Sequence, residues 1–260
     1  MTITKIRTEP VSDRPARTTT DRTSAAIDPA RLGTTVAIWA HPDDETYLCG
    51  GLLASLRDAG QRVVVITATH GEAGIDPALA DVAAAAGMRA AECHAALRVL
   101  GVSEQHWLGY ADGRCASADP HRAVERLGEL LDDIRPATVI GFGPDGFTGH
   151  PDHIAVGRWV ERACARTAVR PRLWQPVVTP ERRDRHRDVE DAFGVFALGE
   201  PRQCSEPDLA GLLQLDGPAL RRKVAALRCH ASQTTALIAA MGDEQYADWV
   251  SVESFAEASV

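Results

Sequence analysis

The sequence predicts an α/β fold. We expect one Rossmann-like domain of three layers, in which helices cover both faces of a mainly parallel sheet. Nearly continuous apolar runs with many β-branched residues occupy 34–40, 61–69 and 137–143, as expected of strands buried on both faces. Helical segments separate these runs, and strands that alternate with helices are typical of a parallel sheet. The 260 residues contain no internal repeat or long linker, so we expect one large core.

Local signals place the other elements. Pro151 falls in the first turn of a helix that opens at "HPDH", where its missing N–H costs nothing. The mixed-charge stretch 181–191 is predicted to be a surface loop. Residues 1–31, poor in large apolar side chains, are predicted to form a flexible tail before the domain at 32–260. Further helices are expected at 50–60, about 76–100, about 121–135 and 217–233, and short strands at 104–109 and 172–178.

The amino-acid composition argues against several classes of binding partner. The chain is 45% hydrophobic and 25% charged, with a net charge of -8, which argues against nonspecific binding of nucleic acid or an anionic membrane. No window reaches the roughly 18 apolar residues of a membrane span, and the N-terminus lacks the apolar core of a signal peptide. Six scattered cysteines without a CxxC pair favour reduced thiols. We therefore expect a cytoplasmic protein.

Two chemically dense segments follow buried strands. "HPDDE" places His41, Asp43 and Asp44 after the first strand, and "HPDH" places His150 and His153 after the strand at 137–143. The carboxyl ends of parallel strands share one sheet edge, where ligands bind. Two histidines and an aspartate are a common ligand set for catalytic zinc. Each motif alone also fits a turn with helix-capping residues, but both together favour a metal site.

Several further segments accompany these motifs in a fixed order. They are "TATHGEAG" (67–74), "RAAECHAALRVLG" (89–101), "LGYADG" (108–113) and "KVAALRCHASQ" (223–233). Together with "AHPDDE" and "HPDH", the set resembles the LmbE-like, or PIG-L-like, family of zinc-dependent de-N-acetylases over most of residues 34–260. The resemblance implies an LmbE-like fold.

The resemblance also implies roles for individual residues. By that resemblance, His41, Asp44 and His153 are the metal ligands, and Asp43 is the general base. His150 takes the electrophilic role. Arg89 and Asp112 match places where the family contacts substrate, although each also fits an ion pair.

The implied activity is that of a zinc-dependent hydrolase acting on a linear amide bond. It would remove the acetyl group from a small molecule containing N-acetylglucosamine, releasing acetate and a free amine. Iron(II), manganese or cobalt also suits such ligands. An amidase acting on a thiol-sugar conjugate, or a metal-binding module without turnover, remains an alternative. Assembly into a homo-oligomer stays open.

A few neighbouring residues carry weaker expectations. Glu45 is expected either to shape the turn of the first motif or to hold a ligand histidine by a hydrogen bond. Glu72 is expected to contact either a loop backbone or the substrate. His230 is expected to pack against the end of the sheet, and His70 to be a solvated loop residue. Some sugar-deacetylating relatives carry a tyrosine two positions before the first histidine of "HPDH", whereas this chain has Thr148.

Overall fold

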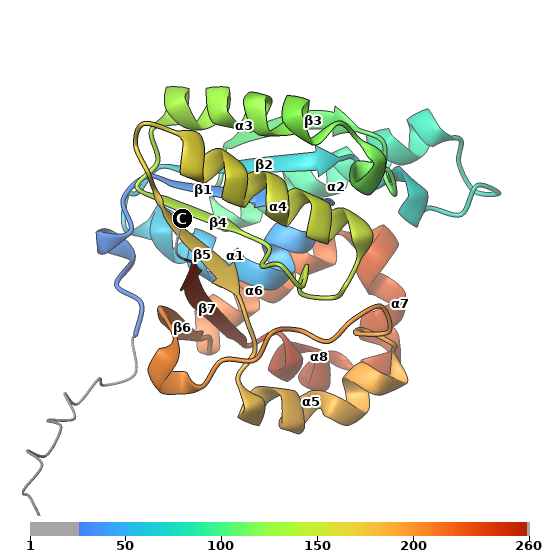
Figure 1. Cartoon of the computed structure of the whole chain (residues 1–260). Coiled ribbons are helices and arrows are strands. Elements are labelled where there is room, and N and C mark those ends of the chain that lie inside the picture. The colour runs from blue at the N-terminus through green and yellow to red at the C-terminus, as the bar shows by residue number, and fades with distance from the viewer. Residues whose placement is uncertain (1–25, 259–260) are drawn as a thin grey trace, which may run out of the picture.

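A seven-stranded sheet forms the centre of the computed structural model, which describes residues 26–258 (Figure 1). Its strand order is β3-β2-β1-β4-β5-β7-β6. The strands are β1 (Thr35–Trp39), β2 (Val63–Thr69), β3 (Glu104–Tyr110), β4 (Thr138–Gly141), β5 (Arg172–Pro176), β6 (Gly211–Gln214) and β7 (Val252–Ala258). The first five in this order pair in parallel, while β7 runs antiparallel to β5 and β6. The prediction of a mainly parallel sheet is confirmed.

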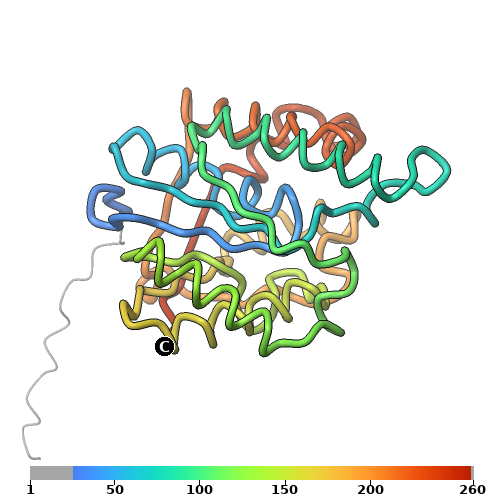
Figure 2. The backbone as a smooth tube through the Cα atoms, turned by 90° about the horizontal axis from the view of Figure 1, so that it is seen from above, coloured from blue at the N-terminus to red at the C-terminus, as the bar shows by residue number. Residues whose placement is uncertain are grey.

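Helices cover both faces of this sheet, as predicted. On one face α1 (Asp44–Asp58), α2 (Val82–Leu100) and α6 (Gly217–Cys229) contact one another. On the other, α3 (Pro120–Ile134) packs on α4 (Pro151–Arg166), and the view from above separates the two layers (Figure 2). Every residue of β1 and β2 is buried between the layers, which explains their uninterrupted apolar sequences.

The topology decides where a ligand can bind. From β1 the chain proceeds to β2 and β3 on one side and later adds β4 and β5 on the other. The loops after β1 and β4 therefore lead to helices on opposite faces, and a crevice opens between them. The two histidine motifs follow these two strands.

Three local predictions need correction. The stretch 181–191 is not a loop but part of helix α5 (Pro180–Ala192). The helix predicted at 217–233 ends at Cys229, and α7 (Ala231–Met241) and α8 (Asp243–Trp249) follow it. The helix predicted from residue 50 is the second half of α1, which begins at Asp44 and kinks at Cys49.

Helix α5 forms because its charges are paired inside the protein. The Thr179 side chain caps the helix by accepting the Arg182 amide hydrogen, and Pro180 occupies the first turn. Glu190 is fully buried, where it accepts hydrogen bonds from Arg182 and Arg183 at 2.8 and 3.0 Å. Paired in this way, a highly charged sequence can be buried.

The predicted tail is described only in part. Residues 1–25 lie outside the described residues. Ala26 forms a bridge with Leu212, and a 3-10 helix at Pro29–Arg31 begins after the capping residue Asp28.

The kink in α1 is stabilised by a buried ion pair. Cys49 has non-helical backbone angles, which interrupt the hydrogen bonds along the helix. Glu253 of β7 accepts the amides of Gly51 and Leu52 at 2.7 and 2.8 Å. Lys223 of α6 donates to the Tyr47 carbonyl at 2.8 Å and to Glu253 at 2.7 Å. The pair thus satisfies backbone groups that the kink leaves free.

Replacing Lys223 with methionine is expected to lower the free energy of unfolding by about 3–5 kcal/mol, because the Glu253 charge stays buried without a partner. Urea unfolding followed by circular dichroism measures the effect. Arg228→Met, which removes an exposed ion pair with Asp243 from the same helix, is the control and should cost less than about 1 kcal/mol. Equal losses in the two variants would contradict this role of Lys223.

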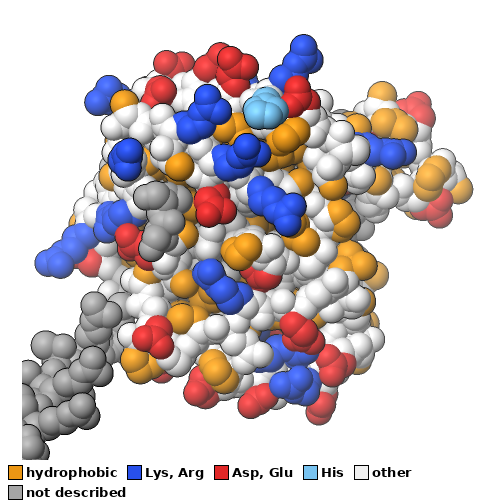
Figure 3. Space-filling view, in the orientation of Figure 1, with side chains coloured by type: hydrophobic (Ala, Val, Ile, Leu, Met, Phe, Trp, Pro, Cys, Tyr) orange, Lys and Arg blue, Asp and Glu red, His pale blue; other side chains and the backbone are white. Residues whose placement is uncertain are grey.

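Two surface properties bear on partners. On the face shown in Figure 3, acidic and basic side chains are interspersed. Among residues 26–258, we find no helix both long and apolar enough to span a bilayer.

Candidate metal centre

The two histidine motifs meet at the crevice between β1 and β4. His41, Asp43 and Asp44 come from the turn between β1 and α1, and His150 and His153 from the start of α4. The ring centroids of His41, His150 and His153 lie 5.0 to 5.1 Å from one another. One nitrogen of each ring lies within 4.8 Å of the others, so these rings can share one metal ion.

The hydrogen bonds of the two inner histidines identify their free nitrogens. The Nδ1 of His153 lies 3.0 Å from the Gly146 carbonyl oxygen, which can only accept, so Nδ1 carries the proton and Nε2 a lone pair. The Nε2 of His41 lies 3.0 Å from Asp112 Oδ1 and 3.5 Å from Asp152 Oδ2. The two carboxylates favour the proton of neutral His41 on Nε2, which leaves the lone pair on Nδ1.

These lone pairs converge on one point. The Nδ1 of His41 and the Nε2 of His153 are 3.1 Å apart. The Asp44 carboxylate adds two oxygens, at 3.4 Å from the His153 nitrogen and 3.7 Å from the His41 nitrogen. Three electron-rich groups this close need a proton or a metal cation between them. The donor set fits a divalent cation.

The pKa shifts of His41 and His153 show how charge is distributed in this cluster. Burial opposes a charge on His41, yet Asp112, Asp152 and Asp44 together raise its pKa to about 10. Burial and the neighbouring His41 charge lower the pKa of His153 to about 3. The acidic groups around the cluster therefore favour one positive charge on His41, while His153 stays neutral.

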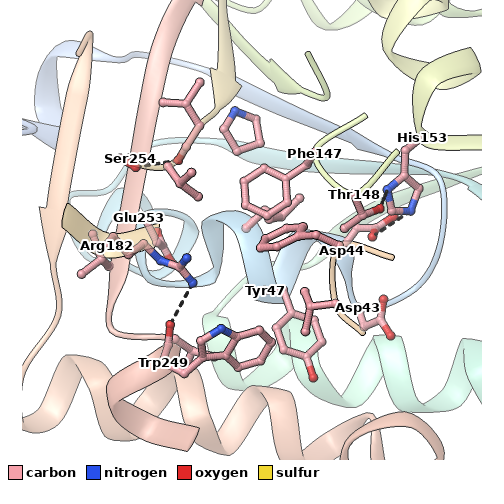
Figure 4. A pocket seen from close by; sticks show the side chains of 18 of the residues that line it. Asp43, Asp44, Tyr47, Phe147, Thr148, His153, Arg182, Trp249, Glu253 and Ser254 are labelled. Atoms are coloured by element: carbon pink, nitrogen blue, oxygen red, sulfur yellow. Dashed lines mark hydrogen bonds and ion pairs between the residues drawn. The ribbon is translucent and has the colours of Figure 1, made fainter. Parts of the chain in front are cut away.

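In Figure 4 the Asp43 carboxylate points away from Asp44 and His153. The Asp43 backbone has φ of +108°, a conformation rare for residues other than glycine, and its side chain caps no helix. The carboxylate lies 3.4 Å from the Arg89 guanidinium. Burial raises the pKa of Asp43 to about 6, although Arg89 opposes this shift. The turn thus places the Asp43 carboxylate beside Arg89.

Buried contacts of Glu45 and His230 support the turn that carries Asp43. Glu45 accepts the Asp43 amide hydrogen at 3.2 Å and lies 3.3 Å from His230, which is fully buried. The Glu45 carboxylate, despite burial, raises the pKa of His230. The hydrogen bond to the Asp43 amide agrees with the expectation that Glu45 shapes this turn, whereas His230, expected to pack against the end of the sheet, contacts Thr46 and Glu45 of α1.

His150 is both a helix cap and a member of the cluster. Its Nδ1 accepts the Asp152 amide hydrogen at 3.2 Å at the start of α4. The remaining ring nitrogen, Nε2, is therefore the one that carries a proton in the neutral ring. Burial and the neighbouring His41 lower the pKa of His150. The capping alternative thus holds for His150, and the same ring lies in the cluster that could hold a metal ion.

Comparison with known proteins identifies the family. The family model PIG-L, described as GlcNAc-PI de-N-acetylase, matches residues 36–164. The 1D-myo-inositol 2-acetamido-2-deoxy-alpha-D-glucopyranoside deacetylase of Kineococcus radiotolerans is 33% identical over 272 residues, covering 83% of this chain and 75% of that relative. The chain belongs to the PIG-L family. The resemblance that its ordered motifs carry is confirmed.

Solved structures confirm the fold of this PIG-L family member. The N,N'-diacetylchitobiose deacetylase of Pyrococcus horikoshii superposes with a TM-score of 0.58 at 20% identity, covering 86% of this chain and 83% of that one. The 4-carboxy-2-hydroxymuconate hydratase GalB of Pseudomonas putida gives 0.61 at 16% identity, covering 88% and 97%. Because a deacetylase and a hydratase share this fold, the fold alone does not decide the reaction.

The two residues predicted to contact substrate have partners within the protein. Arg89 is buried and donates to the Pro42 carbonyl at 2.5 Å as well as facing Asp43. Asp112 faces His41 and also accepts the Ala73 amide hydrogen at 2.9 Å. Both therefore support the motif after β1 in this structure.

Two loop residues also have protein partners. Glu72 accepts the Asp112 amide hydrogen at 2.9 Å, which is the loop contact expected as one of its two alternatives. His70 stacks on Trp107 with ring centroids 4.3 Å apart.

Sequence reasoning missed Asp152. Its fully buried carboxylate accepts the amides of Gly113 and Cys115 at 2.8 and 3.0 Å and faces His41. These hydrogen bonds and His41 outweigh burial and lower the pKa of Asp152 to about 2. An acidic residue between two candidate ligands in "HPDH" was the available signal.

A cavity of about 530 Å³ opens beside the metal cluster (Figure 4). Asp43, Asp44 and His153 form part of its wall. Sequence reasoning also missed the far walls, because they come from β5, the segment after α5, α7 and α8. Those walls include Phe196, Leu237 and Trp249.

Replacing Gly149 with alanine is expected to lower activity at least about tenfold, because a Cβ at φ of +74° would meet the backbone of Leu198 and lie 2.6 Å from the Gly199 nitrogen. Amide hydrolysis and the melting temperature measure the effect. Gly113→Ala is the control, since its φ is +72° but nothing lies within 4 Å. Equal loss in both variants would show that backbone strain, not the contact with Leu198, matters.

Proposed function

We propose that this protein is a metal-dependent N-deacetylase that hydrolyses the acetamide of a small molecule containing N-acetylglucosamine, releasing acetate and a free amine. The observation that carries the proposal is the convergence of two imidazole nitrogens and the Asp44 carboxylate beside the carboxylate of Asp43. Family membership and the deacetylase relatives support it.

His41, Asp44 and His153 would hold the ion, and zinc (Zn2+) suits two imidazoles and a carboxylate. Iron(II), manganese or cobalt suits the same donors. When bound, such a cation polarises an amide carbonyl and lowers the pKa of water. Asp112 and Asp152 face the Nε2 of His41 at 3.0 and 3.5 Å and favour the proton at that nitrogen.

Asp43 acts as the general base. Its carboxylate takes a proton from the water that attacks the acetamide carbonyl, and later returns a proton to the departing amine. Its ion pair with Arg89 and the strained turn hold it in place.

His150 stabilises the negative charge that develops on the carbonyl oxygen. In its neutral form it donates from Nε2, because Nδ1 is occupied by the Asp152 amide. Thr148 stands where some relatives carry tyrosine, and its hydroxyl lies 3.2 Å from His153 Nδ1. The shorter hydroxyl leaves more of this work to His150.

The test is acetate and amine release from a panel of N-acetylglucosaminides by the metal-loaded protein. We expect turnover of at least one member and none by the metal-stripped protein. A thiol-sugar conjugate in the same panel examines the amidase alternative. Metal-loaded, folded protein that hydrolyses no acetamide in the panel would overturn the proposal and favour a binding module.

A further inference from the structure

We propose that the cavity beside the metal cluster binds an apolar group of the substrate, of the size of an aromatic ring system or a branched hydrocarbon, and not a polyol. This inference rests on the proposed function and specifies the substrate class. It starts from the position of the cavity, since Asp43, Asp44 and His153 belong to its wall. A group bound there lies next to the amide to be hydrolysed.

Most of the wall is hydrocarbon. In Figure 4 the rings of Tyr47, Phe147 and Trp249 surround the cavity. Tyr47 and Trp249 meet edge to face with centroids 5.8 Å apart, and Phe147 and Phe196 at 5.9 Å. The aliphatic part consists of Leu48, Pro176, Val177, Val178, Val195, Leu237, Val250 and Val252.

The polar side chains far from the metal cluster are already engaged. Both carboxylate oxygens of Glu253 are taken by Lys223 and the amides of α1. Arg182 donates to Glu190 at 2.8 Å and to the Trp249 carbonyl at 3.2 Å. The Ser254 hydroxyl donates to the Val177 carbonyl at 2.6 Å.

Two further polar side chains of the wall, those of Tyr47 and Gln233, are engaged in part. The Tyr47 hydroxyl accepts a hydrogen bond from Tyr246 at 2.9 Å. The Gln233 amide group donates to the Gly74 carbonyl at 3.3 Å. Few hydrogen-bonding groups of the wall therefore remain for a ligand.

This arrangement selects against a cyclitol. Each inositol hydroxyl that enters without a partner loses its hydrogen bonds to water, which costs free energy. An apolar group loses nothing there and gains from leaving water. The relative from Kineococcus radiotolerans is named for a myo-inositol glycoside. This chain is thus expected to prefer a different substituent.

Within the proposed function the apolar group belongs to the aglycone of an N-acetyl substrate; an amide with a longer acyl chain is the other source of such a group, and substrate arms separate the two. We would compare kcat/KM for N-acetylglucosamine, its myo-inositol glycoside, its 2-naphthyl glycoside and N-octanoylglucosamine. We expect one of the last two to exceed the inositol glycoside by at least about tenfold. A preference for the naphthyl glycoside assigns the aglycone, and one for the octanoyl amide assigns the acyl chain.

Matched variants test the cavity itself. Leu237→Asn places an amide of similar shape in the wall and should lower the preference for the apolar substrate at least about fivefold relative to the inositol glycoside. Val195→Thr, which changes only one methyl to a hydroxyl, should lower it in the same direction. Leu79→Asn is the control, because Leu79 is 81% exposed and outside the wall, and it should leave the preference unchanged.

A binding measurement separates failure of this inference from failure of the proposed function. Calorimetry should detect 2-naphthyl glucoside binding to the metal-free protein, weakened in Leu237→Asn, and no binding of myo-inositol. An inositol glycoside hydrolysed as well as or better than both apolar substrates would overturn the inference and leave the deacetylase proposal standing. If no acetamide is hydrolysed, the proposed function fails, and absent naphthyl glucoside binding then overturns the inference as well.

Discussion

Replacing His153 with alanine is expected to abolish stoichiometric metal binding and reduce amide hydrolysis to background. The substitution removes one of three donors that converge within about 4 Å of one another, and leaves His41 and Asp44 as a two-residue site. Catalytic zinc sites in proteins use three protein ligands. Elemental analysis of protein dialysed against dilute zinc should therefore fall from roughly one ion per chain to a trace.

Two further variants serve as comparisons for the metal content of His153→Ala. Asp152→Asn weakens the support of His41 without removing a ligand, so metal affinity should fall only about 10- to 100-fold. His70→Ala removes an imidazole that stacks on Trp107 outside the cluster, and metal content should not change. A folded His153→Ala protein that binds zinc as tightly as the parent would place the ion elsewhere.

Replacing Asp43 with asparagine is expected to retain the metal and lower kcat about 10²- to 10⁴-fold. The amide has the same shape and tolerates the positive φ of this position, but it cannot take a proton from water. Metal content and steady-state kinetics are measured on the same preparation. This pairing of intact metal with lost turnover distinguishes a base from a ligand.

The matched control is Asp132→Asn, on the exposed side of α3, which should change neither quantity. Loss of the metal together with activity would make Asp43 a ligand. Retention of most of the parental rate by a metal-loaded Asp43→Asn protein would remove Asp43 from the mechanism.

The parts of the fold that the sequence predicted are those with a strong local signal. Strands β1, β2 and β4 are buried on both faces, and their side chains must be apolar at nearly every position. The residues of helix α5 were predicted to form a surface loop, because a stretch with so many charges is usually exposed to solvent. Its buried Arg183 and Glu190 satisfy each other seven residues apart, and no local pattern shows that both point inward.

Part of the candidate site could likewise be predicted from local sequence, and part could not. The closeness of His41 and His153 could be predicted, since parallel strands bring their carboxyl ends to one edge. The strand order that makes this edge a crevice could not, because it depends on which strands pair across more than a hundred residues. The tautomers of the histidines likewise depend on Gly146, Asp112 and Asp152, which reach them from separate loops.

The sequence by itself determined the chemical inventory of this protein: buried strands, two histidine motifs behind them, and carboxylates too crowded to lack a counter-charge. Those properties are local, since hydrophobic periodicity and charge density are carried by adjacent residues. Only the tertiary structure decided which lone pairs meet, that Asp43 stands apart from the ligands, and that hydrocarbon from α7, α8 and the segment after α5 lines the cavity. Such properties depend on long-range packing, where a side chain's partner is set by the whole topology and not by its neighbours in the chain.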